Sequence, residues 1–316
     1  MEFDLIKRLT ELNSVQREDV ILGIGDDAAR LLVPDGHELI VSMDTLVSGV
    51  HFPENTTPQA IGYKALAVNL SDLAAMGAEP AWVTLALTMP QANSLWLEAF
   101  AQGFLTLARE HNVQLIGGDT TQGPLSITVQ AHGFTPRGQA LTRAGAKVGD
   151  YIAVTGYLGD AGRELKSLNK SSPLNDAINR LNYPYPRVQA GLALLGIATA
   201  CIDISDGLIA DLGHILERSQ VGARVLLDKI PISEASLHSK GFPVLELALT
   251  AGDDYELCFT FPESRIDDIN KIQHQLSLPM THIGFIEETR GLRLHRPDGR
   301  PIEIANNGYQ HFSKKK

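Results

Sequence analysis

Residues 22–31 read LGIGDDAARL, and this stretch decides between two kinds of α/β fold. It follows the apolar pair Val20-Ile21, and its glycines formally match the G-x-G-x-x-A fingerprint of a dinucleotide-binding fold. In that fold, however, Asp26 and Asp27 would face the pyrophosphate directly. The segment Pro34-Asp35-Gly36 would also end the following helix within about two turns. We therefore reject the dinucleotide-binding fold.

The same two carboxylates indicate a bound cation. Two like charges about 4 Å apart repel by about 4 kcal/mol at the effective dielectric of a protein surface, so an intervening ion is needed. If Asp27 contacts a phosphate through a bound Mg²⁺ ion, the negative charge of an aspartate at a glycine turn is compatible with the negative charge of the phosphate. The turn therefore predicts a metal-assisted phosphate site.

Composition excludes several classes of protein. The chain has 316 residues, long enough for about two domains, and 44% of them are hydrophobic. Its formal net charge of −10 argues against a broad basic face for nucleic acid. No Gly-Lys-Ser/Thr of a Walker A loop and no HRD or DFG of a protein kinase occurs.

The cysteines and the length of the apolar runs indicate in which cellular compartment the protein is expected. Cys201 and Cys258 lie in apolar stretches without the spacing of a disulfide framework, so we expect two buried thiols. No apolar run reaches the roughly 18 residues of a membrane span, and residues 1–13 lack the apolar core of a signal peptide. We expect a cytoplasmic protein.

The first half of the chain predicts strands and two long helices. Thr57 as N-cap and Pro58 at the first helical position begin one helix, and Gly77 is its C-cap. Apolar residues at helical spacing, from Leu97 to Leu107, predict a second helix from Ser94 to Glu110. The predicted strands are 20–24, 39–44 (running on towards Phe52), 82–87, 113–116 and 125–129, the last two bracketing a turn at GGDTTQGP.

Turn residues at 135–138 and again at 145–150 place a domain boundary near residue 140. Beyond it, strands and helices alternate. The predicted elements are a strand at 151–154, a helix at 188–195, a strand within ACIDIS and a helix within DGLIADLGHILERS, followed by strand VLL, helix PVLELALT, strand ELCFTF and a helix at 266–276. We predict a mixed α/β chain with domains 1–140 and 141–316.

Aspartates recur where these elements end, beside glycine, serine or threonine. Each one alone is readily explained as an N-cap or an Asx-turn, as Asp206 before the helix at Gly207 illustrates. Asp72 is different, because it lies in mid-helix among apolar neighbours, where a carboxylate needs a cation or a hydrogen-bond network. Together they indicate several divalent ions. The set is Asp26, Asp27, Asp44, Asp72, Asp119, Asp203, Asp206, Asp253 and Asp254.

Eight strings in order identify a family. They are GIGDDAA, SMDTLVSGVHF, AVNLSDLAAMGAEP, LIGGDTT, LTRAGAKVGD, VTGYLGDAG, IDISDGL and AGDDYELCF. Each is weak alone, but the ordered set strongly resembles the thiamine-monophosphate kinase family, of the aminoimidazole ribonucleotide synthetase superfamily. The resemblance covers nearly the whole chain, including NGYQHF near its end.

This resemblance implies a two-domain PurM-like architecture. Its N-terminal domain, a mixed sheet or half-barrel with helices, binds ATP and Mg²⁺ and forms a homodimer, and its C-terminal domain is α/β. It implies a transferase, a kinase of thiamine biosynthesis, that phosphorylates thiamine monophosphate to thiamine diphosphate. ATP is the co-substrate and several Mg²⁺ ions take part; a need for K⁺ stays open, and no nucleic acid or membrane partner is implied.

The resemblance also carries site residues over by position. Metal ligands match Asp27, Ser42, Met43, Asp44, Asp72, Asp119, Asp203 and Asp206. ATP contacts match Gly118, Asp119, Arg143 and Ser205, and positions near thiamine match His51, Asp253 and Tyr309. We take Asp72, Asp119 and Arg143 as the catalytic set.

Two positions depart from the family. It often has Ser or Thr where Met43 stands, and since a thioether is a poor Mg²⁺ ligand, ligation there falls to the main-chain carbonyl. It often has Glu where Asp253 stands, which leaves the reach of Asp253 open. His51 as a core histidine, Tyr309 as C-terminal packing and Arg143 in a surface ion pair remain the alternatives.

The acceptor in this reaction is already an anionic phosphate, so no strong general base is needed. We expect direct in-line transfer by alignment and charge neutralisation. Two other functions stay open. One is another synthetase of the superfamily, such as a selenophosphate synthetase, although its reactive Cys in a Gly-rich N-terminal segment has no counterpart here. The other is a non-catalytic dimer that senses Mg-ATP.

Overall fold

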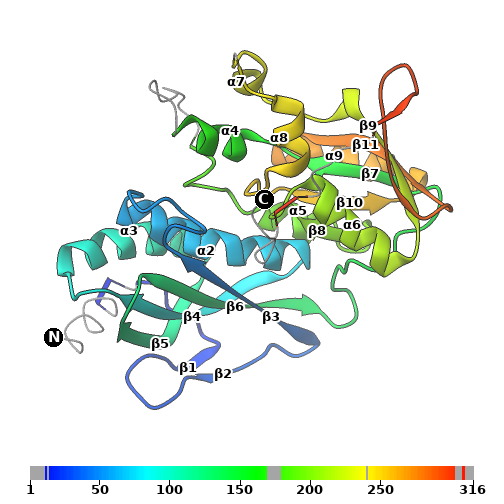
Figure 1. Ribbon diagram of the computed structural model, residues 1–316. Helices are drawn as coiled ribbons and strands as arrows, with labels where there is room; N and C mark the ends of the chain where they lie inside the picture. Colours follow the sequence, from blue (N-terminus) through cyan, green and yellow to red (C-terminus); the bar gives the residue numbers. More distant parts are fainter. Residues whose placement is uncertain (1–10, 13, 169–178, 240, 303–307, 310–316) are drawn as a thin grey trace. The chain divides into compact units, whose positions relative to one another are not determined.

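The computed structural model describes residues 11–12, 14–168, 179–239, 241–302 and 308–309. Its contacts divide the chain into two units, one of Met1–Leu73 with Ala78–Ala140, the other of Ala74–Gly77 with Leu141–Lys316. Each unit has its own sheet (Figure 1). The mixed α/β class expected from the sequence is confirmed.

The first unit is built on a four-stranded sheet of order β3-β6-β4-β5. Strands β3 (His37–Val47), β6 (Ser126–Pro136) and β4 (Glu79–Met89) pair antiparallel, and β5 (Gln114–Gln122) runs parallel to β4. Two helices, α2 (Pro58–Ala75) and α3 (Ser94–Glu110), lie on one face of this sheet (Figure 1). The sheet is therefore mixed, and β3 and β5 are its edges.

Helix α2 begins where the sequence predicted. The Thr57 hydroxyl accepts a hydrogen bond from the N–H of Ala60, and Pro58 is the first helical residue. At the other end Gly77 adopts φ +64°, and Ala78 N–H donates to the carbonyl of Leu73, as in a glycine C-cap. These predictions are confirmed.

The other face of this sheet is only partly covered. The short hairpin of β1 (Val20–Leu22) and β2 (Arg30–Leu31) packs its apolar residues there against a small core that includes Trp82 and Phe134. Along β3 the side chains of Leu39, Val41 and Met43 on this face are 41%, 48% and 62% exposed. A row of apolar side chains on edge strand β3 is therefore exposed to solvent.

Three strand predictions need correction. Residues 117–122, expected as part of a turn, continue β5, because each pairs in parallel with a residue of β4 from Thr84 to Met89. The non-local pairing overrides the local turn signal of glycine and threonine. The first strand ends at Leu22 rather than Ile24, and β3 ends at Val47, where residues 49–51 form a turn.

The second unit holds a seven-stranded sheet of order β13-β12-β9-β11-β7-β10-β8. The pairs are antiparallel except for β9 with β12. Its strands are β7 (Tyr151–Thr155), β8 (Ala200–Asp203), β9 (Gly222–Leu226), β10 (Leu257–Phe261), β11 (Met280–Glu287), β12 (Gly291–His295) and β13 (Pro301–Ile302).

Two helices of the second unit, α6 and α8, share one core with the strands of this sheet, and the members of this core include Leu212, Ile215 and Leu249 together with Ile202 and Cys258. The helices of this unit are α4 (Asp160–Ser167), α5 (Val188–Ala193), α6 (Leu208–Ser219), α7 (Glu234–Leu237), α8 (Val244–Thr250) and α9 (Ile266–Leu276), and its 3₁₀ turns are η1 (Leu227–Lys229) and η2 (Glu263–Arg265). Cys201 and Cys258 are free, buried thiols, as predicted. None of the described helices is long and apolar enough to cross a membrane.

Candidate active site

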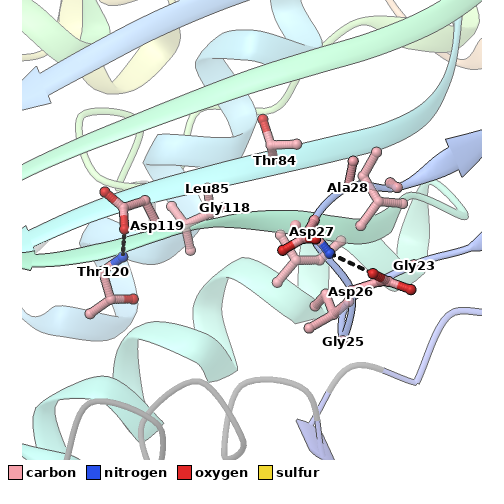
Figure 2. A pocket seen from close by; sticks show the side chains of 15 residues that line it. Gly23, Gly25, Asp26, Asp27, Ala28, Thr84, Leu85, Gly118, Asp119 and Thr120 are labelled. Atoms are coloured by element: carbon pink, nitrogen blue, oxygen red, sulfur yellow. Dashed lines mark hydrogen bonds between the residues drawn. The ribbon is translucent and has the colours of Figure 1, made fainter.

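A pocket of about 720 Å³ opens in the first unit between the β1–β2 loop and the strands β4 and β5 (Figure 2). The loop supplies residues 23–29, which include the glycine turn and the paired carboxylates of Asp26 and Asp27. The strands supply Thr84 and Leu85 from β4 and residues 115–120 from β5. The predicted metal ligands Asp27 and Asp119 thus line one pocket.

The carboxylates of Asp26 and Asp119 are held by the local backbone, and those of Asp26, Asp27 and Asp119 remain exposed to solvent. The N–H of Asp27 donates to Asp26 Oδ1 at 2.8 Å, and the N–H of Thr120 donates to Asp119 Oδ1 at 2.9 Å (Figure 2). Each hydrogen bond fixes a side chain without using all of its oxygen acceptors. The pocket therefore offers carboxylate oxygens to a ligand.

Glycines bring the floor of the pocket close to its wall. Gly118 has φ +152°, and a Cβ there would collide with the carbonyl oxygen of Leu85 on β4. Gly117 beside it has more room, since its nearest neighbour would be a methyl group of Thr84 at 4.0 Å. Bare backbone at these positions lets a phosphate or a ring approach closely.

A second group of predicted ligands gathers on α2 and β3. The Ser42 hydroxyl donates a hydrogen bond to Asp72 Oδ2, and the N–H of Asp44 donates to the amide oxygen of Asn69 at 3.1 Å. Asn69 is almost fully buried and also donates to Ala65 O at 3.0 Å, so its orientation is fixed. Alternation along β3 points Met43 to the opposite, open face.

The two groups stand at opposite edges of the sheet. Asp119 lies on edge strand β5 beside Ala86 of β4, which pairs with Thr128 of β6, which pairs with Thr45 of edge strand β3. Three strand spacings amount to about 14 Å. Within the described part of the chain, no group of three or more His, Cys, Asp or Glu side chains is placed to hold a metal ion.

His51 lies in the turn after β3. Its Nδ1 accepts a hydrogen bond from the N–H of Val47 at 2.9 Å, which leaves Nε2 to carry the proton in the neutral ring. The buried ammonium of Lys64 donates to the His51 carbonyl at 3.3 Å. The turn is therefore tied to α2 as well as to β3.

In the second unit, four predicted residues meet at the N-terminus of α6. The N–H of Asp253 donates to Ser205 O at 2.9 Å, and the N–H of Tyr309 donates to Asp206 O at 3.1 Å. Asp253 has φ +59°, and the Tyr255 hydroxyl donates to its Oδ1 at 3.1 Å. Ser205, Asp206, Asp253 and Tyr309 thus form one cluster, next to Asp203 at the end of β8.

Asp211, which the sequence analysis missed, organises this cluster. Its Oδ2 accepts from the N–H groups of Ser205, Asp206 and Gly207 at 3.0, 3.0 and 3.1 Å. Burial raises the pKa of Asp211 to about 7, although the three N–H donors act in the opposite direction. Asp206 does not cap α6, because Gly207 is the N-cap residue.

Asp254, the neighbour of Asp253, has a structural contact. The N–H of Gly159, the N-cap residue of α4, donates to both of its oxygens at 2.9 and 3.0 Å. Burial raises the pKa of Asp254 well above its ordinary value. Its carboxyl faces the protein interior rather than a ligand.

Arg143 does not join this cluster. It lies on an exposed loop at the C-terminal end of α6, whereas Ser205 and Asp206 precede the N-terminal end. The twelve residues of α6 put about 18 Å between its two ends. Two predicted ATP contacts, Arg143 and Ser205, are therefore far apart in the second unit.

Comparison with known proteins bears on what these sites do. The chain matches the AIR synthase related proteins, their N-terminal domain over residues 25–135 and their C-terminal domain over residues 147–296. Thiamine-monophosphate kinase of Escherichia coli (strain K12) is 48% identical over 320 residues, covering 99% of this chain and 98% of the relative.

Solved structures of thiamine-monophosphate kinases are also similar to this chain. The crystal structure of thiamine-monophosphate kinase from Stenotrophomonas maltophilia K279a is 48% identical, with a TM-score of 0.87 over 95% of this chain and 98% of that one. The structure of AaThiL complexed with AMPPCP and TMP is 31% identical, with a TM-score of 0.78 over 98% of this chain and 96% of that one. The likeness thus extends over both units.

Proposed function

The chain belongs to the thiamine-monophosphate kinases, within the AIR synthase related proteins, and we propose that it transfers the γ-phosphoryl group of ATP to thiamine monophosphate. The product is thiamine diphosphate. One observation carries the proposal: the oxygen-rich, glycine-floored pocket of Asp27, Gly118 and Asp119 lies within a chain that is 48% identical to such a kinase along its length.

The chemistry needs little from the protein beyond alignment. The acceptor phosphate is already anionic, so no side chain has to remove a proton from it. In-line transfer then requires the two phosphates to be held together against their mutual repulsion. We assign that holding to Arg143 directly and to Asp72 and Asp119 through the Mg²⁺ ions that they would bind.

The donor set fits Mg²⁺. Asp27, Asp119 and the Ser42–Asp72 pair present only oxygen atoms, the ligands this ion prefers. Asp44, Asp203 and Asp206 extend the set, and Met43 joins it through its main-chain carbonyl. Bound Mg²⁺ would neutralise charge on the transferring phosphoryl group, and we leave K⁺ as an ion to test.

The remaining residues are assigned by chemistry. Gly118, whose lack of a side chain lets β5 approach Leu85 of β4 closely, contacts ATP beside β5. Arg143 and Ser205 contact ATP at two separate points. Tyr309, whose ring is 45% exposed, offers an aromatic face to the flat, cationic thiamine, with His51 and Asp253 as further contacts.

We propose that the enzyme works as a homodimer in the cytoplasm. The open face of the first sheet, with Leu39, Val41 and Met43 exposed on its edge strand, is the surface we assign to the second copy. A second copy is also a way to bring the ligand groups at opposite edges of the sheet to one site. Two free buried thiols are consistent with a reducing compartment.

The first experiment follows ³¹P resonances of Mg-ATP with thiamine monophosphate. We expect the paired diphosphate signals of thiamine diphosphate together with ADP, lost in Asp72→Asn. Asp268→Asn on α9 is the matched control, because it removes one carboxylate from an exposed ion pair with Arg265. Intact ATP would contradict the kinase proposal and indicate a sensor, and ADP with free phosphate would indicate another acceptor.

A further inference from the structure

The loop that carries Arg143 is held from several sides. Its Thr142 carbonyl accepts from the N–H of Cys201 at 2.9 Å, and the Thr142 hydroxyl donates to Ala144 O at 2.7 Å. Gly145 has φ +126° and lies against the carbonyl of Thr199, where no side chain would fit. The backbone of Arg143 therefore belongs to a closely packed loop, from which its side chain extends.

The side chain that ties this loop to α6 is Ser219, the last residue of that helix. Its hydroxyl donates to Arg143 O at 3.1 Å and accepts from the N–H groups of Gly145 and Ala146 at 3.2 and 3.1 Å. One hydroxyl thus supplies a donor and two acceptor positions, its full capacity. These three hydrogen bonds fix the backbone on the C-terminal side of the Arg143 side chain, and the Thr142 carbonyl holds it on the N-terminal side.

The three hydrogen bonds of Ser219 also shape the surface beside Arg143. A pocket of about 560 Å³ is lined by Arg143 together with His214, Glu217, Arg218 and Gln220 of α6 and its C-cap. Two guanidinium groups and an imidazole around one pocket suit the phosphates of a nucleotide. The pocket has this lining because Ser219 places the loop against the exposed side of α6.

We propose that Ser219 is a positioning residue for nucleotide binding, and that it acts through Arg143. This inference rests on the proposed function, since Arg143 is taken there as an ATP contact. Holding the loop before ATP arrives lowers the ordering cost of binding. A serine at the end of a helix is otherwise unremarkable in sequence, and only the three contacts single it out.

The test measures the affinity for a non-hydrolysable ATP analogue with Mg²⁺ by calorimetric titration, and the KM values for both substrates. We expect Ser219→Ala, which removes all three hydrogen bonds to the loop, to raise the Kd and the KM for ATP about fivefold. The KM for thiamine monophosphate and the melting temperature should change little. Ser219→Thr, which keeps the hydroxyl, should restore the affinity.

Two further variants separate positioning from general weakening of the unit. Ser167→Ala on α4 removes one serine hydrogen bond, to Glu164 O at 2.7 Å, and should leave the affinity for ATP unchanged. Arg143→Gln should weaken ATP binding, and adding Ser219→Ala to it should weaken binding no further.

Additive losses in the double variant would overturn the inference, as would an Arg143→Gln protein that binds ATP normally. The titration needs no turnover, so its result stands apart from the assay of phosphoryl transfer. A protein that binds the analogue through Ser219 and Arg143 but makes no thiamine diphosphate would contradict the proposed function alone.

Discussion

The hydroxyl of Ser42 donates a hydrogen bond to the carboxylate of Asp72, joining edge strand β3 to α2 across thirty residues of sequence. The structure places Asp72 in the last turn of α2, which ends at Ala75, and not in mid-helix as the sequence suggested. A carboxylate among apolar neighbours needs a partner, and Asp72 has one in Ser42, which is itself a candidate metal ligand. Hydrogen bonds of this kind orient a ligating carboxylate. Strand and helix therefore present the two side chains as one unit.

Ser42→Ala should weaken metal use more than it weakens the fold. Without the hydroxyl, Asp72 loses one restraint on its orientation, and the Mg²⁺ concentration for half-maximal activity should rise about tenfold. The free energy of unfolding should fall by about 1 kcal/mol. Magnesium titrations of activity and urea unfolding measure both.

Thr106→Ala is the control for this prediction. It removes an exposed hydroxyl that donates to Gln102 O within α3. Its magnesium curve should match that of the unchanged protein. If Ser42→Ala also leaves the curve in place, the Ser42–Asp72 pair has no part in metal binding.

Local signals in the sequence predicted both long helices of the first unit, whereas α4 and α7 of the second unit were not predicted. Helix α3 begins at Ser94 and ends at Glu110 as expected, because five apolar residues at helical spacing bury one face. Helix α2 begins at Pro58 because Thr57 and Pro58 carry the start signal within two residues. The family resemblance, confirmed by the comparisons, supplied the two-domain fold and the activity.

Features that depend on distant residues could not be predicted in this way. Gly117 to Gln122 look like a turn until β4 pairs with them. Spacing along the chain also does not tell which edge of a sheet an aspartate will occupy, so the separation of Asp119 from Asp44 was not foreseeable. Asn69, Asp211 and Ser219 act through hydrogen bonds to backbone groups that lie elsewhere in the fold, and no sequence pattern predicts such contacts.

Gly103→Ala should strongly destabilise the first unit. A methyl group on Gly103 of α3 would collide with the carbonyl oxygen of Gln59 on α2, where the two helices cross closely. Forcing them apart should cost about 3 kcal/mol. Gly213→Ala on α6 is the matched helical change with nothing within 4 Å of the added methyl.

Because alanine is the better helix former, Gly213→Ala should stabilise the protein by about 0.5–1 kcal/mol. Urea unfolding of both variants measures the contrast. Equal effects of the two substitutions would mean that the close crossing of α2 and α3 contributes nothing to stability.

His132 should make the protein less stable in acid. Burial lowers its pKa, although a hydrogen bond with the Trp82 backbone acts in the opposite direction. Its buried Nδ1 has no hydrogen-bond partner among the described residues. The unfolded chain, with a histidine pKa of about 6.5, then binds more protons than the folded one.

Stability from His132 is therefore fully present above about pH 6.5 and is lost as the pH falls towards the lowered pKa of the folded state. His132→Phe keeps a flat ring and cannot titrate. The loss of unfolding free energy between about pH 7.5 and about pH 5.5 should be smaller in this variant than in the unchanged protein. An identical loss in the two proteins would show that His132 is protonated as readily in the fold as outside it.

Two neighbouring glycines offer the sharpest test of the pocket. Gly118→Ala would drive a methyl group into the carbonyl oxygen of Leu85 and strain a backbone at φ +152°, so β5 must move away from β4. We expect ATP affinity to fall at least tenfold, because Asp119 follows directly on the displaced strand. Gly117→Ala adds the same methyl one residue earlier, at ordinary contact distance from Thr84, and should keep the affinity within about threefold. Titration with an ATP analogue compares the affinities of the two variants. A larger loss of affinity in Gly117→Ala than in Gly118→Ala would contradict this prediction. It would mean that added bulk beside Thr84, and not the close approach of β5 to β4, controls nucleotide binding.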